Sequence, residues 1–142
     1  MDITTPSPAA AAEPMSPLQV FFSLRGRIPR RTYWLYGVLA LLGLGLYAKA
    51  LLDIARVRPE ATDALINLLL LWPAIAISAK RWHDRDKSGW WVLIVLLPVI
   101  GGLWALVDNG FLRGTPGPNR FGADPLGGPN LKETPGRFNN AR

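Results

Sequence analysis

Three apolar stretches of about twenty residues constrain the fold more than any other feature of this sequence. They cover residues 33–52, 62–79 and 90–112. Each is long enough to cross a hydrocarbon core of about 30 Å at a rise of about 1.5 Å per residue. Charged residues stand only near their ends, so none has the polar face of a helix in a water-soluble domain. The pattern predicts an all-α membrane protein with three transmembrane helices and short basic loops.

The third stretch allows two interpretations, because Pro98, Gly101 and Gly102 interrupt it near its middle. In the first it crosses the membrane as a tilted helix, for which its length suffices. In the second the chain turns at residues 98–102 and returns as a re-entrant hairpin. We expect the full crossing, which places the C-terminal segment on the side opposite to the loop at 80–89. The pair Trp72-Pro73 predicts a bend in the second span.

The segments outside the apolar stretches have the composition of flexible chain. Residues 1–17 are rich in alanine, proline and serine and lack the apolar region of a signal peptide, so we expect a disordered tail. Residues 127–142 are rich in glycine, proline and asparagine, and we expect a second flexible tail there. Between them, Leu18, Phe21 and Phe22 have helical spacing and predict a short helix on the membrane surface.

Positive charge gathers in two clusters that flank the spans, within a net charge of +6. The members are Arg25, Arg27, Arg30 and Arg31 before the first span, and Lys80, Arg81, Arg85 and Lys87 after the second. In the loop between the first two spans, two arginines are offset by acidic residues. The positive-inside rule therefore places the N-terminus and the second loop in the cytoplasm. Because the charge flanks membrane spans, we predict no nucleic-acid partner.

The composition argues against most catalytic and metal chemistry. The chain has no cysteine, which excludes disulfides, iron-sulfur clusters and thiolate zinc sites, and a single histidine cannot form a multi-histidine site. His83 and Asp84 are adjacent and could serve a membrane enzyme as a proton acceptor. We favour a packing role for His83 and a charge-balancing role for Asp84. We predict no catalytic residues, no metal, no cofactor and no enzymatic activity.

Aromatic residues and two isolated charges complete the membrane pattern. We expect an interfacial aromatic belt formed by Tyr33, Trp34, Trp82, Trp90 and Trp91. Lys49 in the first span and Asp108 in the third should both lie near the outer interface if all three helices cross.

Three ordered motifs resemble the DUF805 family (domain of unknown function 805), a group of bacterial multi-pass inner-membrane proteins. A pattern F-x-G-R-x-x-R-x-x-Y-W is matched by Gly26, Arg27, Arg30, Tyr33 and Trp34. A pattern R-R-L-H-D-x-x-x-S-G-W-W is matched by Arg81, His83, Asp84, Ser88, Gly89, Trp90 and Trp91. A pattern G-x-N-R-[YF]-G-x-D-P is matched by Gly117, Asn119, Arg120, Phe121, Gly122, Asp124 and Pro125. The departures are Leu24, Lys80 and Trp82.

The resemblance covers residues 18–126 and implies location and architecture rather than an activity. Lys80 in place of arginine argues against a bidentate contact at that position. Together with the charge pattern, the motifs suggest a contact site for lipid headgroups or a partner protein, formed by Arg25, Arg27, Arg30, Arg31, Lys80, Arg81, His83, Asp84, Asn119 and Arg120.

We therefore predict a non-enzymatic component of the bacterial inner membrane that binds lipids or a membrane protein partner. The alternative is a subunit of a small oligomeric transporter or channel. Pairs of small residues one helical turn apart, Ala74 with Ser78 and Gly101 with Ala105, would permit a homo-oligomer.

Overall fold

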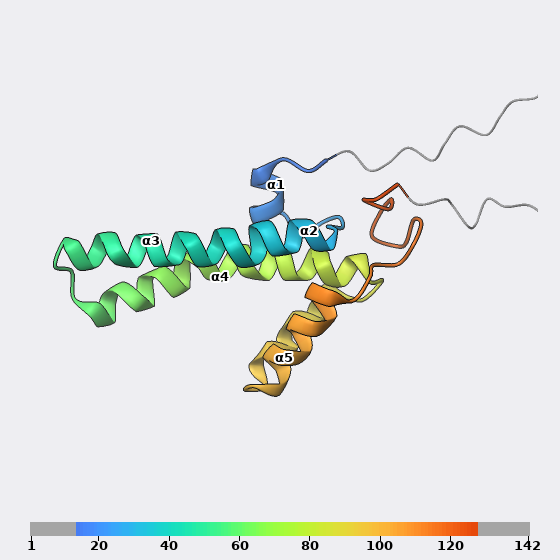
Figure 1. Ribbon diagram of the computed structural model, residues 1–142. Helices are drawn as coiled ribbons and strands as arrows, with labels where there is room; N and C mark the ends of the chain where they lie inside the picture. Colours follow the sequence, from blue (N-terminus) through green and yellow to red (C-terminus); the bar gives the residue numbers. More distant parts are fainter. Residues whose placement is uncertain (1–13, 128–142) are drawn as a thin grey trace, which may run out of the picture.

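The computed structural model describes residues 14–127 and is helical over most of that range (Figure 1). Most of the two predicted flexible tails, 1–17 and 127–142, lies outside the described residues. The first element, α1 (Pro17–Phe22), begins at the side chain of Ser16, which accepts a hydrogen bond from the Gln19 backbone N–H. The predicted short helix is therefore present, and its position at the membrane surface stays a prediction. Its Val20 is buried, whereas Leu18 and Phe22 are exposed.

The first predicted span is a continuous helix from Arg30 to Ile54. It consists of α2 (Arg30–Thr32), a π-helical segment η1 (Tyr33–Ala40) and α3 (Leu41–Ile54). The second is α4 (Pro59–Asp84), which runs antiparallel beside α3 and bends partway along, as the proline inside it predicts (Figure 1). Within residues 14–127, these two helices are long and apolar enough to cross a membrane.

The predicted third crossing is wrong, because the third apolar stretch folds back on itself as a hairpin. Its first arm is a 3-10 helix, η2 (Gly89–Leu96), and its second arm is α5 (Ile100–Leu106) followed by a π-helical turn, η3 (Val107–Phe111). The arms pack against each other and run obliquely away from α4 (Figure 1). The stretch therefore has the hairpin geometry of the second interpretation.

Three residues explain the reversal. Pro98 keeps the residue before it, Leu97, in an extended conformation, which ends the first arm. Val99 has a φ of 63° and a ψ of −64°, and the N–H of Ile100 donates to the carbonyl of Pro98 at 2.7 Å, which is the geometry of a tight γ-turn. Gly101 then lets the arms meet, since a Cβ there would lie 1.7 Å from the carbonyl oxygen of Ile94.

The hairpin brings the end of the third stretch back to its beginning. Lys87 Nζ, just before the first arm, lies 3.1 Å from Oδ1 of Asp108 in the last turn of the second arm. The C-terminal segment therefore lies at the same end of the molecule as the two basic clusters, not at the opposite end as three crossings require. Asp108 is accordingly not near Lys49, which pairs with Asp63 at 2.6 Å at the other end.

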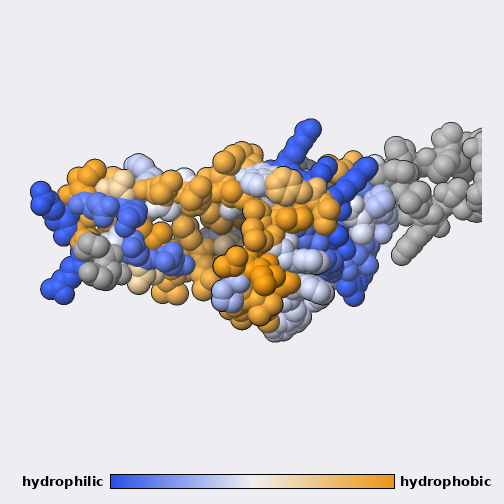
Figure 2. All heavy atoms as spheres, turned by 60° about the horizontal axis from the view of Figure 1, so that its bottom comes forward, coloured by the Kyte–Doolittle hydropathy of each residue, from blue (hydrophilic) through white to orange (hydrophobic). Residues whose placement is uncertain are grey.

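The surface between the two ends is apolar. Figure 2 shows a hydrophobic band that separates hydrophilic groups at both ends of the molecule. Many large apolar side chains in it are more than half exposed, among them Leu39, Leu68 and Leu96. A continuous apolar surface of this kind is rare on a soluble monomer and is typical of contact with lipid. The small buried core, around Ile28 and Ile77, lies where α1 and η1 meet α4.

Candidate functional site

A buried ionic network occupies the basic end, with Asp84 at its centre. Arg27 Nη2 lies 3.1 Å from one carboxylate oxygen of Asp84, and Arg81 Nη1 lies 2.5 Å from the other. Arg27 comes from the segment between α1 and α2, whereas Arg81 and Asp84 belong to the last turn of α4. All three residues are at most 4% exposed. Buried charges of this kind stabilise a fold only when they are paired and hydrogen-bonded, as these are.

The two arginines also hold the C-terminal segment in place. Arg27 donates to the carbonyl oxygens of Gly117 and Thr115, each at 2.7 Å. Arg81 donates to the carbonyl of Asn109 at 2.6 Å and to that of Leu112. Because a guanidinium has five N–H donors in a fixed fork, each arginine can bind a carboxylate and several carbonyls at once. The network therefore joins the N-terminal segment, α4 and the end of the hairpin.

Lys80 uses its charge differently. Its Nζ donates to the carbonyl oxygens of Gln19, at 3.1 Å, and Val20, at 2.7 Å, and to that of Ser23. These carbonyls lie at the end of α1, where helical carbonyls lack intrahelical partners, although that of Gln19 also accepts from the N–H of Ser23 at 3.2 Å. An ammonium group has three donors, and here all three meet backbone oxygens. The lysine therefore fixes α1 against α4.

Several predicted contact residues are thus inside the protein. Four of them are buried against protein groups and cannot contact lipid headgroups directly in this structure: Arg27, Lys80, Arg81 and Asp84. Trp82 is fully buried, with its ring 6.0 Å from that of Trp91, so its predicted place in the interfacial belt is wrong. The other belt residues are at least partly exposed: Tyr33, Trp34, Trp90 and Trp91.

The three family-like motifs converge at this end. The His83 ring stacks on Phe121 at 4.0 Å between centroids, and its Nδ1 lies 3.3 Å from the carbonyl oxygen of Gly26. Asn119 donates to the carbonyl of His83 at 2.8 Å, and Arg120 donates to that of Asp86 at 2.7 Å. Residues 24–34, 80–91 and 117–125, far apart in sequence, therefore form one cap on the α3–α4 pair.

Asp108 is joined to this cap by ion pairs, which the sequence pattern did not predict. Its Oδ1 lies 2.8 Å from Arg85 Nη1 as well as close to Lys87, and the residue is 3% exposed. The only available signal was a single carboxylate inside an apolar run. A carboxylate buried there needs cations as partners. The basic cluster after the second span supplies two of them, Arg85 and Lys87. Among residues 14–127, no group of three or more metal-binding side chains is positioned to hold an ion.

The two ends of the molecule differ strongly in charge. Within the described residues, the basic end carries ten lysines and arginines against four aspartates, which leaves six positive charges. The opposite end carries three basic and three acidic residues and is neutral. Arg25, Arg31 and Arg113 are exposed at the basic end, and their guanidinium groups have no hydrogen-bond or ion-pair partner within residues 14–127.

Comparison with known proteins shows to which protein family this chain belongs. Residues 21–123 match the family described as protein of unknown function DUF805. The chain belongs to the DUF805 family. This confirms the resemblance seen in the three motifs. No solved structure matches the chain.

Three relatives of this DUF805 protein come from Escherichia coli strain K12. Inner membrane protein YhaH is 38% identical over 112 residues, which cover 76% of this chain and 91% of YhaH. Uncharacterized protein YiiR is 35% identical over 136 residues, covering 75% of this chain and 88% of YiiR. Inner membrane protein YhaI is 32% identical over 116 residues, covering 82% and 97%. With the apolar helices, these relatives indicate a membrane protein.

Proposed function

We propose that this DUF805 protein is a non-enzymatic component of the bacterial inner membrane that binds anionic phospholipid headgroups at its basic end. The observation that carries the proposal is the charge asymmetry among residues 14–127, with a net charge of +6 at one end and zero at the other. A cation close to an anionic leaflet contributes about 1 kcal/mol to binding. Exposed arginines that have no partner within residues 14–127 can make that contribution, whereas the buried ones hold the cap together.

The same asymmetry supports a topology with two spans and one re-entrant hairpin. The N-terminal segment, the loop at 85–88 and the C-terminal segment lie at the basic end, and the positive-inside rule places that end in the cytoplasm. With three crossings, Arg113 and Arg120 would stand on the outer side and oppose the rule. With the hairpin, every lysine and arginine of the cap is on the cytoplasmic side.

Lipid retention tests the proposal. We would extract wild type and an Arg25→Gln/Arg113→Gln variant gently from the membrane and count bound phosphatidylglycerol by native mass spectrometry. The matched control is Arg56→Gln/Arg58→Gln, which removes the same charge from two exposed arginines at the opposite end. We expect the first variant to retain less phosphatidylglycerol than wild type and the control to retain as much.

Equal retention by all three proteins would contradict the proposal. If a protein co-migrates with wild type and is lost from the Arg25→Gln/Arg113→Gln variant while lipid retention is unchanged, the exposed arginines form a protein-binding surface instead. Both outcomes are readable in the same spectra, because bound lipids and bound proteins add very different masses.

A further inference from the structure

We infer that one anionic phospholipid occupies a groove between η1 and η3, with its phosphate on Arg30 and Arg31 and an acyl chain along Leu35 and Leu39. The inference deepens the proposed function and rests on it, because it assigns one site within the anionic-lipid contact. The groove has a volume of about 580 Å³, within the range of about 300–1,000 Å³ that is usual for small-molecule sites.

The groove joins a basic mouth to an apolar wall. Arg31, Leu35 and Leu39 recur every fourth residue, so they follow one another along one face of the first span. Arg31 stands at the cytoplasmic end of this row, and the two leucines continue it toward the middle of the apolar band. Leu35 is 55% and Leu39 61% exposed. A phospholipid has the same order of chemical groups as this row: a charged phosphate at the membrane surface, followed by an apolar acyl chain.

The floor of the groove is built by the two π-helical segments. The indole N–H of Trp34 in η1 donates to the carbonyl of Gly110 in η3 at 3.0 Å, and the Trp34 and Phe111 rings pack edge to face at 5.6 Å. A Cβ at Gly110 would lie 2.9 Å from the Trp34 ring, so the glycine permits the close approach. π-helical turns are rare and frequently occur at functional sites, and here two of them line one groove.

The mouth carries positive charge that the described part of the chain leaves uncompensated. Arg30 donates one N–H to the carbonyl of Phe111 at 2.8 Å, and Arg31 has no hydrogen-bond or ion-pair partner within residues 14–127. No aspartate or glutamate of that range forms an ion pair with either one. Guanidinium groups bind phosphate oxygens through paired N–H donors, which suits two adjacent arginines to an anionic headgroup.

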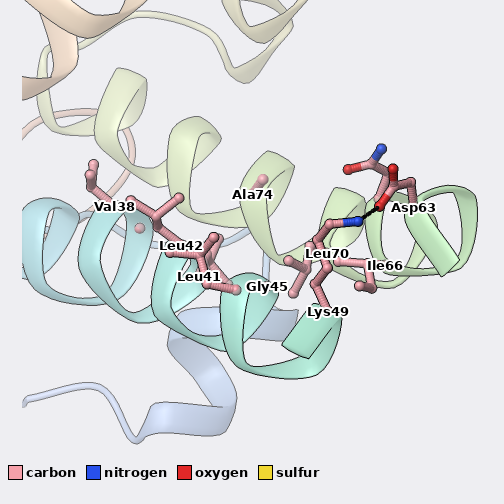
Figure 3. Close-up of a pocket in the computed structure, with 12 residues that line it drawn as sticks. Val38, Leu41, Leu42, Gly45, Lys49, Asp63, Ile66, Leu70 and Ala74 are labelled. Carbon is pink, nitrogen blue, oxygen red and sulfur yellow. Dashed lines mark hydrogen bonds and ion pairs between the residues drawn. The ribbon is translucent and has the colours of Figure 1, made fainter. Parts of the chain in front are cut away.

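A second groove shows why charge decides between candidate sites. It lies between α3 and α4, has a volume of about 560 Å³ and is also mostly apolar (Figure 3). Its polar end holds Lys49 and Asp63, which neutralise each other at 2.6 Å (Figure 3). It therefore offers no net charge to an anionic headgroup. The two grooves have similar volumes, but the mouth of one is positively charged and the polar end of the other is neutral, which makes one a control for the other.

Two leucines on the same helix allow a matched test. Leu39 lines the arginine groove and Leu42 lines the α3–α4 groove, and their exposed fractions are 61% and 58%. We would reconstitute wild type, Leu39→Trp, Leu42→Trp and Arg31→Gln in nanodiscs that contain phosphatidylglycerol and phosphatidylethanolamine. Native mass spectrometry at rising collision energy then measures which lipid leaves last, and thermal unfolding checks that each variant is folded.

We expect wild type and Leu42→Trp to hold one phosphatidylglycerol after all other lipids have left. Leu39→Trp fills the acyl position and should lose that lipid, and Arg31→Gln should hold it about fivefold less well. Inorganic phosphate should not displace it, because it has no acyl chain for the wall. Displacement by phosphate alone would overturn the phospholipid assignment.

The groove assignment is also wrong if Leu39→Trp holds the last phosphatidylglycerol as well as wild type does. If Arg31→Gln still lowers total retention in that case, the headgroup contact at the basic end survives and only the groove fails. If neither Arg31→Gln nor Arg25→Gln/Arg113→Gln changes retention, the proposed function fails with it.

Discussion

Asp84 is the residue on which the cap depends, because two buried guanidinium groups share its carboxylate. Its surroundings leave no room for change: a Cβ at Gly114 would lie 2.0 Å from its Oδ2. The sequence indicated two of the three parts of the cap, residues 24–34 and 80–91, which were expected on one side of the membrane, but the expected third crossing placed residues 117–125 on the other side. The sequence could not show which arginines are buried, since burial here depends on carbonyls of residues 109–117 that no side-chain pattern encodes.

The Asp84→Asn substitution should destabilise the protein strongly. It removes the carboxylate charge and leaves Arg27 and Arg81 buried without a counter-ion, which costs about 3–5 kcal/mol. The control is Asp86→Asn, because Asp86 pairs with Arg120 at the surface, with half-exposed side chains, and such pairs contribute at most about 1 kcal/mol. Thermal unfolding in one detergent measures both. Equal melting temperatures for the two variants would show that the network does not stabilise the cap.

The hairpin is the element in which the length of an apolar stretch proved misleading. Residues 90–112 are long enough to cross a membrane, but Pro98, Val99 and Gly101 reverse the chain halfway. The interrupting residues are visible in the sequence and left the re-entrant interpretation open. The decisive contacts, from Asp108 back to Arg85 and Lys87, join residues more than twenty positions apart, and a pattern of local hydropathy contains no information about them.

Two neighbouring glycines test the hairpin at the scale of this element. Gly101→Ala places a Cβ 1.7 Å from the backbone of the other arm, whereas a Cβ at Gly102 meets nothing within 4 Å. We expect Gly101→Ala to lower the melting temperature clearly, because the backbone contact cannot be relieved by rotating a side chain. Gly102→Ala should be neutral or slightly stabilising, since alanine favours helix. A melting temperature for Gly101→Ala equal to that of Gly102→Ala would mean that the arms are not in contact.

At the scale of the whole molecule, two long apolar helices and a hairpin place most of the polar contacts at one end. The cap region contains the buried network, the exposed arginines and the mouth of the proposed lipid groove, while the opposite end consists of a short loop and the neighbouring helix ends, whose charges sum to zero. The first two long apolar helices, the basic clusters and the family were all predictable, because each is recorded in local composition or in short motifs. The end of the molecule at which the C-terminal segment lies was not predictable, because it depends on whether residues 90–112 form one long helix or fold back as a hairpin.

The most direct test of this account is the accessibility of single cysteines, which the native chain lacks. We would introduce Arg56→Cys in the loop between the spans, Ser88→Cys before the hairpin and Ala123→Cys after it, and treat intact cells with a membrane-impermeant thiol reagent. We expect labelling of Arg56→Cys alone, with Ser88→Cys and Ala123→Cys labelled only after the membrane is opened. Labelling of Ala123→Cys but not Ser88→Cys on intact cells would contradict it, because the third stretch would then cross the membrane.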